Sequence, residues 1–287
     1  LTNYKVLKNF LKDAIGLAYY HFSPWDVQFT EDDIIEWHKK EWSGPITAVS
    51  VMHSMNTLCA RNKGYKTYIC KDNNLFDFCY PIAHEIPSSR FIFLYRDPRD
   101  VVASQLNRPR QTKSIAKLAT LWRDEQIKAI KAITSPILKK HLVTEVSYEE
   151  LVQDEALAIK NICKALKVSN LSPDTKENVY SDEATDIHEW KNLNKPTTQA
   201  SLKRYKKELK TRNIKFIENI VWHQMKYLEY VPDCFERPKI KQQMILAEKS
   251  LMGVWSTINR LGQKSKLNKG QRERQQFIKM MKNRTYL

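Results

Sequence analysis

Arginine and serine side chains in one short segment have the types and spacing that bind a phosphate. The segment covers residues 95–108 and contains Arg96, Ser104 and Arg108. Ser104 and Arg108 are four residues apart, so they would share one face of a helix. Two guanidinium groups and a hydroxyl would then converge on one anion through charge-assisted hydrogen bonds. The alternative is a capped helix in which Arg96 and Arg99 pair with neighbouring aspartates.

The elements around this segment favour an anion site. Residues 90–95 show no polar alternation after Arg90, which predicts a strand buried on both faces of a parallel sheet. Asp97 is a good N-cap and Pro98 a good first helical residue, so a helix should begin there. Open α/β sheets bind ligands where a strand ends and a helix begins, and helix N–H groups favour anions.

A second basic residue, Lys71, follows another short β-type run at residues 67–70. It precedes Arg96 by 25 residues, which leaves room for one helix between two strands. In a βαβ unit both side chains would emerge at the same edge of the sheet. We therefore expect Lys71 and Arg96 to belong to one site; the alternative is a lysine that is simply exposed.

Helical and extended patterns alternate through residue 166, which predicts a doubly wound α/β fold with a parallel sheet flanked by helices. A further strand is expected at 141–145, and Trp122 should lie in the core between helix and sheet. Helical spacing is found at residues 4–20, 46–58, 75–84, 98–106, 114–133, 148–166 and 202–230.

The remaining segments are a predicted loop and a basic extension. Residues 170–199 are polar, and two basic helices are expected near 241–260 and 270–283. We divide the chain into a domain at 1–235 and a helical extension at 236–287.

The composition indicates a folded, basic protein. Apolar residues make up 42% of the 287 residues and charged residues 28%, which excludes wholesale disorder. The net charge is +16, of which residues 236–287 contribute +10 from 13 basic and 3 acidic side chains. Such an excess attracts polyanions, although a solvated surface explains it equally well. No apolar run approaches the roughly 20 residues that span a bilayer.

The cysteines point to reduced thiols. Five are scattered along the chain without a CxxC pair, so a cytoplasmic protein is expected. Metal binding is not expected, because no cluster of ligand residues has suitable spacing. The chain begins with Leu1 rather than Met, so an upstream segment is expected to have been removed. Two glycosylation sequons, at Asn170 and Asn283, keep the Golgi lumen as an alternative.

Residues 71–230 resemble a P-loop-fold sulfotransferase that uses 3′-phosphoadenosine 5′-phosphosulfate (PAPS), and are most similar to its tyrosylprotein and bacterial branch. The segment at 92–104 is similar to the family's 3′-phosphate motif. The resemblance implies that Arg96 and Ser104 bind the 3′-phosphate. In the tyrosylprotein branch a further arginine joins them, which implies Arg108.

Other segments extend the resemblance. Lys71, in the run Cys-Lys-Asp-Asn, resembles the family lysine that contacts the sulfuryl group and the reacting oxygens. Tyr148 matches a tyrosine that lies against the nucleotide. Lys195, followed by proline, resembles a lysine that reaches the nucleotide, and residues 201–205 and 225–230 resemble the family's closing segment.

One part of the family pattern is missing. The first strand and its Gly-containing 5′-phosphosulfate loop have no counterpart, and no glycine lies between Gly64 and Gly253. We expect this region to have been lost with the N-terminus; the alternative is a degenerate family member. The family's general base usually follows that loop, so His21, Glu31 and His38 are candidates. His21 is our choice, with a packed histidine in an aromatic cluster as the alternative.

The reaction implied is in-line transfer of a sulfuryl group from PAPS to a hydroxyl or amine. The acceptor would be a carbohydrate, a peptide tyrosine or a small molecule, and the basic C-terminal segment suits an acidic one. No metal is implied. A non-catalytic polyanion- or nucleic-acid-binding protein is one alternative, although it leaves the Arg96 segment unexplained. A nucleotide kinase of related fold is another, but it would need a phosphate loop.

Overall fold

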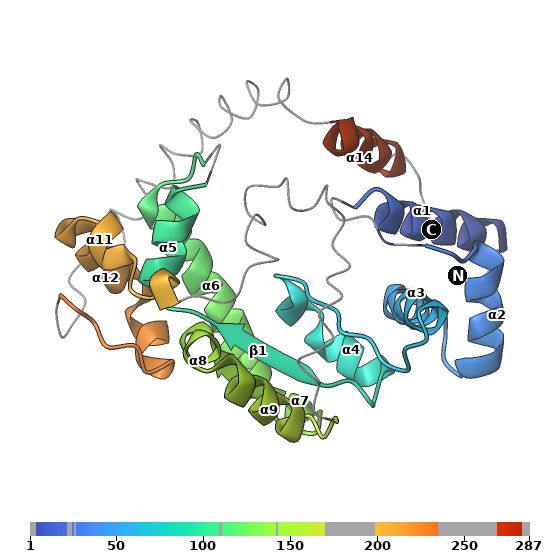
Figure 1. Cartoon of the computed structure of the whole chain (residues 1–287). Coiled ribbons are helices and arrows are strands. Elements are labelled where there is room, and N and C mark those ends of the chain that lie inside the picture. The colour runs from blue at the N-terminus through green and yellow to red at the C-terminus, as the bar shows by residue number, and fades with distance from the viewer. Residues whose placement is uncertain are drawn as a thin grey trace. The chain divides into compact units, whose positions relative to one another are not determined.

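The computed structural model describes residues 4–21, 25, 27–108, 111–141, 143–169, 199–234 and 269–282 (Figure 1). The chain divides into two compact units. The helical unit contains the described residues up to Pro87 together with 269–282, and the sheet unit contains those from Ser88 to Cys234. Within these described ranges, no helix combines the length and apolar character needed to cross a membrane.

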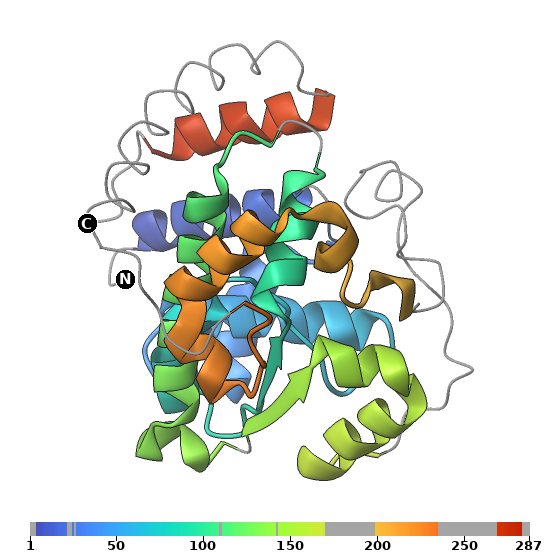
Figure 2. The ribbon, with the colours of Figure 1, turned by 90° about the vertical axis from the view of Figure 1, so that its left-hand side faces the viewer.

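The sheet unit is built on a parallel pair of strands. Strands β1 (Phe91–Tyr95) and β2 (Val143–Ser147) lie side by side, with Phe91 opposite Val143 and Tyr95 opposite Ser147 (Figure 2). The strand expected at 90–95 is confirmed and begins one residue later, at Phe91, while the second strand begins two residues later than expected. In the described part of the chain the sheet has two strands, so it is smaller than the doubly wound sheet that the sequence predicts.

One face of β1 is covered and the other is exposed. Phe93 and Tyr95 pack against a hydrophobic core, whereas Ile92 and Leu94 are 42% and 55% exposed. The prediction of a strand buried on both faces is therefore wrong in the described structure. Successive side chains point to opposite faces of a strand, and among the described elements helices cover only one of these faces.

Helices α6 and α12 supply most of that core. It includes Trp122 from α6, which is 4% exposed as expected for a core residue, and Met225 from α12. The predicted helix at 148–166 is interrupted at Asp154, which caps the next helix through the N–H of Leu157. The helices of this unit are α5 (Pro98–Leu106), α6 (Ile115–Ile133), α7 (Pro136–Lys139), α8 (Tyr148–Gln153), α9 (Glu155–Ala165), α11 (Tyr205–Glu208) and α12 (Thr211–Tyr227), with a short 3-10 turn η3 (Gln199–Ser201).

The helical unit follows the sequence pattern with one exception. Thr30 and Asp33 form a capping box at the start of α2. Residues 67–70 form no strand, and Ile69 is 81% exposed, because this run is not paired with another strand. The helices here are α1 (Tyr4–Tyr19), α2 (Glu31–Glu41), α3 (Ala48–Asn62), α4 (Cys79–Glu85) and α14 (Lys269–Met281), with a 3-10 turn η1 (Leu75–Asp77).

Helix α14 packs against α1 (Figure 1). The Phe277 ring covers Gly16 and lies with its centroid 5.0 Å from that of Tyr20. Arg274 donates to the carbonyl oxygens of Leu17 and Tyr20, at 3.4 and 3.0 Å, where a basic side chain satisfies the free carbonyls at a helix end. The last helix of the predicted extension therefore packs on the first helix, while the segment 241–260 lies outside the described residues.

Replacing Gly16 with alanine should destabilise the helical unit by about 1–3 kcal/mol, the usual cost of overpacking. A Cβ atom at this position would overlap the Phe277 ring. Urea unfolding measures the effect. In a Phe277→Ala background the sign should reverse, because alanine is favoured over glycine in a helix by about 1 kcal/mol. The same loss of stability in both backgrounds would contradict the packing.

Candidate functional site

Arg96 lies between the end of β1 and the start of α5, and its guanidinium group contacts an aromatic ring, a carbonyl oxygen and, at 3.9 Å, the Asp100 carboxylate. Its Cζ atom lies 4.2 Å from the centroid of the Tyr148 ring, which is a cation–π contact. Its Nη2 atom donates to the carbonyl oxygen of Ser201 at 2.8 Å. The buried Nε atom has no hydrogen-bond partner among the described residues. The side chain as a whole is 21% exposed.

Helix α5 begins as predicted, but carboxylates already use its first N–H groups. Asp97 caps the helix by accepting from the N–H of Arg99 at 2.8 Å, and Pro98 is the first helical residue. Glu149 accepts from the N–H of Asp97 at 3.1 Å and from the hydroxyl of Tyr230 at 2.7 Å. The expectation that these N–H groups face an anion is therefore wrong for two of them.

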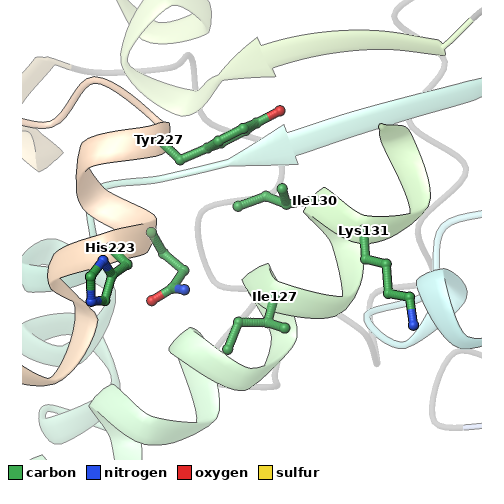
Figure 3. Close-up of a pocket in the computed structure, with 6 residues that line it drawn as sticks. Ile127, Ile130, Lys131, His223 and Tyr227 are labelled. Atoms are coloured by element: carbon green, nitrogen blue, oxygen red, sulfur yellow. The ribbon is translucent and has the colours of Figure 1, made fainter. Parts of the chain in front are cut away.

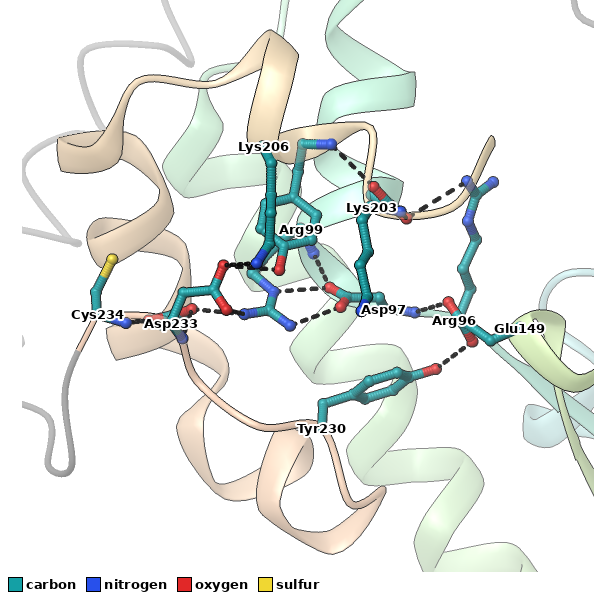
Figure 4. A network of polar contacts seen from close by, with 12 residues as sticks. Arg96, Asp97, Arg99, Glu149, Lys203, Lys206, Tyr230, Asp233 and Cys234 are labelled. Atoms are coloured by element: carbon teal, nitrogen blue, oxygen red, sulfur yellow. Dashed lines mark hydrogen bonds and ion pairs between the residues drawn. The ribbon is translucent and has the colours of Figure 1, made fainter. Parts of the chain in front are cut away.

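Arg99 forms a buried ionic network (Figure 4). It is 4% exposed and donates to both carboxylate oxygens of Asp97, at 3.0 and 2.7 Å, and to Glu218 at 2.8 Å. Asp233 lies 3.6 Å away, and the Tyr205 ring centroid lies 4.4 Å from Cζ. Burial lowers the pKa of Arg99, but the interactions with Asp97, Tyr205 and Glu218 together outweigh it, so the pKa is raised. The ion-pair alternative thus holds for Arg99.

Tyr148 is the first residue of α8 and lies beside Arg96. The preceding Ser147 caps the helix in a capping box with Glu150. The Tyr148 hydroxyl lies 3.0 Å from the Oγ atom of Ser201. The structure therefore brings Arg96 and Tyr148 into contact and places Ser201, from the segment 201–205 that the resemblance singled out, beside both. Nothing in the sequence near Arg96 indicates Ser201, because it lies 105 residues further along the chain.

Comparison with known proteins places this chain. A model described as "Sulfotransferase family" matches residues 15–173, which is more than half of the chain. The chain belongs to the sulfotransferase family. The match covers β1, the start of α5 and Tyr148, and it supports sulfuryl transfer as the general reaction. No curated protein and no solved structure matches the chain.

The other two residues of the family's phosphate motif are placed differently from each other. Ser104 lies in the second turn of α5 and is half-buried. Arg108 is exposed and lies beyond the end of α5, which finishes at Leu106. The prediction of one shared helix face is therefore wrong. A proline disfavours helical geometry at the residue before it, and Pro109 follows Arg108.

The remaining predicted site residues of this sulfotransferase do not belong to the described part of the sheet unit. Lys71 belongs to the helical unit, is exposed, and donates to the Oδ1 atom of Asn73 at 2.7 Å. Its place beside Arg96 stays a prediction. Lys195 lies outside the described residues. His21 follows α1 in the helical unit and is half-buried.

The other two candidate bases differ in burial. His38 is 5% exposed, with Nδ1 2.8 Å from the carbonyl oxygen of Ile34 and Nε2 3.0 Å from Oγ of Ser50. Burial lowers the pKa of His38, which favours a neutral ring held by structural contacts. Glu31 is the first residue of α2 and is half-buried. His38 is thus the weaker candidate for contact with an acceptor.

Two further features complete the description. Within the described ranges, no group of three or more His, Cys, Asp or Glu side chains could hold a metal ion. A groove of about 290 Å³ lies between α6 and α12 (Figure 3). Its lining contains neither Arg96 nor Tyr148, so it is separate from the predicted nucleotide site. The lining residues are Ile127, Ile130, Lys131, His223, Gln224 and Tyr227.

Proposed function

We propose that this chain transfers a sulfuryl group from PAPS to a hydroxyl or amine of an acceptor. The observation that carries the proposal is Arg96, which follows β1, stacks on Tyr148 and is partly exposed, with no hydrogen-bond partner for its Nε atom among the described residues. This arrangement suits a nucleotide phosphate, and family membership favours sulfuryl chemistry. In this proposal β1 and β2 are part of the doubly wound P-loop-type sheet expected from the sequence.

The nucleotide would be held by several basic and hydroxyl groups. Arg96 and Ser104 would bind the 3′-phosphate, and Tyr148 would lie against the nucleotide. Arg108 and Lys195 would add positive charge. Since Arg108 lies outside the helix, it would have to reach the phosphate from the segment after α5.

The chemical step would be an in-line displacement at sulfur. The bond from sulfur to the 5′-phosphate oxygen of the donor breaks, and a bond to the acceptor oxygen or nitrogen forms. Lys71 would neutralise the charge that develops on the bridging oxygen, which is electrostatic stabilisation of the transition state. His21 would accept the acceptor proton. The products are the sulfated acceptor and adenosine 3′,5′-bisphosphate.

The uneven distribution of positive charge along the chain is the basis for the proposed domain division and for an acidic acceptor. We propose residues 1–235 as the sulfotransferase domain and 236–287 as an extension whose charge of +10 attracts an acidic acceptor. The docking of α14 on α1 would place part of that charge on the helical unit.

A thermal-shift comparison of ligands tests the proposal. Adenosine 3′,5′-bisphosphate at 100 times its Kd should stabilise the protein by about 2.7 kcal/mol, whereas ATP with Mg²⁺ should have a smaller effect. A shift with ATP and Mg²⁺ alone would support the kinase alternative. Binding to every nucleic acid with a steep loss at higher salt, and no bisphosphate shift, would support a polyanion-binding protein.

A further inference from the structure

The segment 201–205 forms a wall beside Arg96. The carbonyl oxygen of Ser201 accepts from Arg96 Nη2 at 2.8 Å, and Oγ of the same residue lies 3.0 Å from the Tyr148 hydroxyl. Two residues later, Lys203 has a φ of 53°, in the left-handed region that non-glycine residues rarely adopt. Such a backbone costs free energy and persists only where surrounding contacts hold it.

Asp100 supplies those contacts. Its carboxylate accepts from the backbone N–H of Lys203 at 2.8 Å and from that of Tyr205 at 3.0 Å. Asp100 lies in the first turn of α5 and is 2% exposed. One carboxylate on α5 therefore holds both the strained residue and the first residue of α11.

Asp100 also lies close to the guanidinium group of Arg96. Its Oδ2 atom is 3.9 Å from Arg96 Nη2, an ion pair without a hydrogen bond. Burial raises the pKa of Asp100, while the N–H of Tyr205, the charge of Arg96 and the N–H of Lys203 act in the opposite direction. Asp97 is the further acidic group that acts on it, and it raises the pKa. The carboxylate thus organises the wall and faces the cation that the wall contacts.

We propose that Asp100 is a positioning residue that fixes the segment 201–205 as one wall of the phosphate site at Arg96. The inference rests on the proposed function. Ser201 uses one donor of the Arg96 guanidinium, and Asp100 decides where that carbonyl lies. The donors of the guanidinium group that Ser201 does not use are thereby left for an incoming phosphate. Asp100 itself does not touch the ligand.

The variant Asp100→Asn tests this role. Asparagine has the same shape but only one acceptor oxygen, so one of the two N–H groups would face an NH₂ group. We expect adenosine 3′,5′-bisphosphate to bind about 10-fold more weakly in calorimetry, which is the loss of one hydrogen bond to a charged group. In an Arg96→Ala background, Asp100→Asn should cause no further loss, because the two residues act on the same phosphate.

Asp154→Asn is the matched control. Asp154 also accepts a backbone N–H, that of Leu157 at 2.9 Å, and lies in the same unit. The Asp154→Asn variant should bind the bisphosphate with wild-type affinity. Deuterium exchange of the wild-type protein gives a second readout that needs no variant. Bisphosphate should slow exchange of the Lys203 and Tyr205 amides more than that of the Leu157 amide.

The outcomes separate this inference from the proposed function. If the wild type binds, Arg96→Ala binds weakly and Asp100→Asn binds normally, the positioning role is wrong and the function stands. An equal loss from Asp100→Asn with and without Arg96 would also overturn it, since a general structural effect would produce that result. If the wild type does not bind the bisphosphate, both the proposed function and this inference are overturned. Should Asp100→Asn not fold, unchanged exchange of the two amides on bisphosphate binding would overturn the inference.

Discussion

Replacing Arg99 with alanine is expected to destabilise the sheet unit by about 3–5 kcal/mol, the usual cost of breaking a buried ion pair. Arg99 is 4% exposed, and its partners Asp97 and Glu218 are 6% and 0% exposed. Removing the guanidinium group would leave both carboxylates buried without their cation (Figure 4). Asp97, which caps α5, would also lose the hydrogen bonds from the Arg99 side chain that hold its carboxylate in place.

Urea unfolding followed by circular dichroism measures this loss. Arg204→Ala is the matched control, because Arg204 pairs with Glu208 at a more exposed position. Exposed pairs contribute about 0–1 kcal/mol, so the control should unfold near the wild-type midpoint. Adding Glu218→Gln to Arg99→Ala should recover part of the stability, since it removes one of the unpaired charges. Equal midpoints for Arg99→Ala and Arg204→Ala would show that the network does not stabilise the unit.

Replacing Arg96 with alanine is expected to weaken binding of adenosine 3′,5′-bisphosphate by about 2–5 kcal/mol, or roughly 30-fold to several thousand-fold. The variant loses the charge-assisted hydrogen bonds to phosphate and the cation that stacks on Tyr148. Isothermal titration calorimetry measures the change. Unlike Arg99, Arg96 lies 3.9 Å from its nearest carboxylate among the described contacts. Its removal should therefore cost less stability than that of Arg99.

Two further variants refine the Arg96 test. Arg96→Lys keeps the charge but has no planar guanidinium, so its affinity should fall between those of the wild type and Arg96→Ala. Arg123→Ala is the control, because Arg123 lies on α6 and pairs with Asp124 at 2.7 Å away from the predicted site residues. It should keep wild-type affinity. If Arg96→Ala binds the bisphosphate as tightly as the control, Arg96 is not a phosphate ligand.

Much of the local structure could be predicted because its signals lie within a few residues. Asp97 followed by Pro98 starts α5, and Thr30 with Asp33 starts α2, because a cap needs only the side chains of one helical turn. The end of α5 before Pro109 has an equally local cause. The prediction that Ser104 and Arg108 share one helix face is wrong, because it used their four-residue spacing and left out Pro109.

Long-range pairing could not be predicted from spacing alone. The run at 67–70 has a β-type sequence but forms no strand, since a strand requires a partner elsewhere in the chain. Ile92 and Leu94 are as apolar as Phe91, yet they are exposed because helices cover one face of β1 among the described elements. Pairing and burial depend on neighbours that are distant in sequence.

The amino-acid sequence by itself determined the strand–Arg96–helix segment and the family to which it is similar. Only the tertiary structure decided which arginine is available for a ligand. Arg96 and Arg99 are three residues apart and chemically identical, but Arg99 meets Glu218, 119 residues away, in a buried network. Arg96 instead meets the carbonyl of Ser201 and the ring of Tyr148. The physical reason is that folding decides which carboxylates surround an arginine. Where carboxylates take up its donors, as they do for Arg99, few donors are left for a ligand.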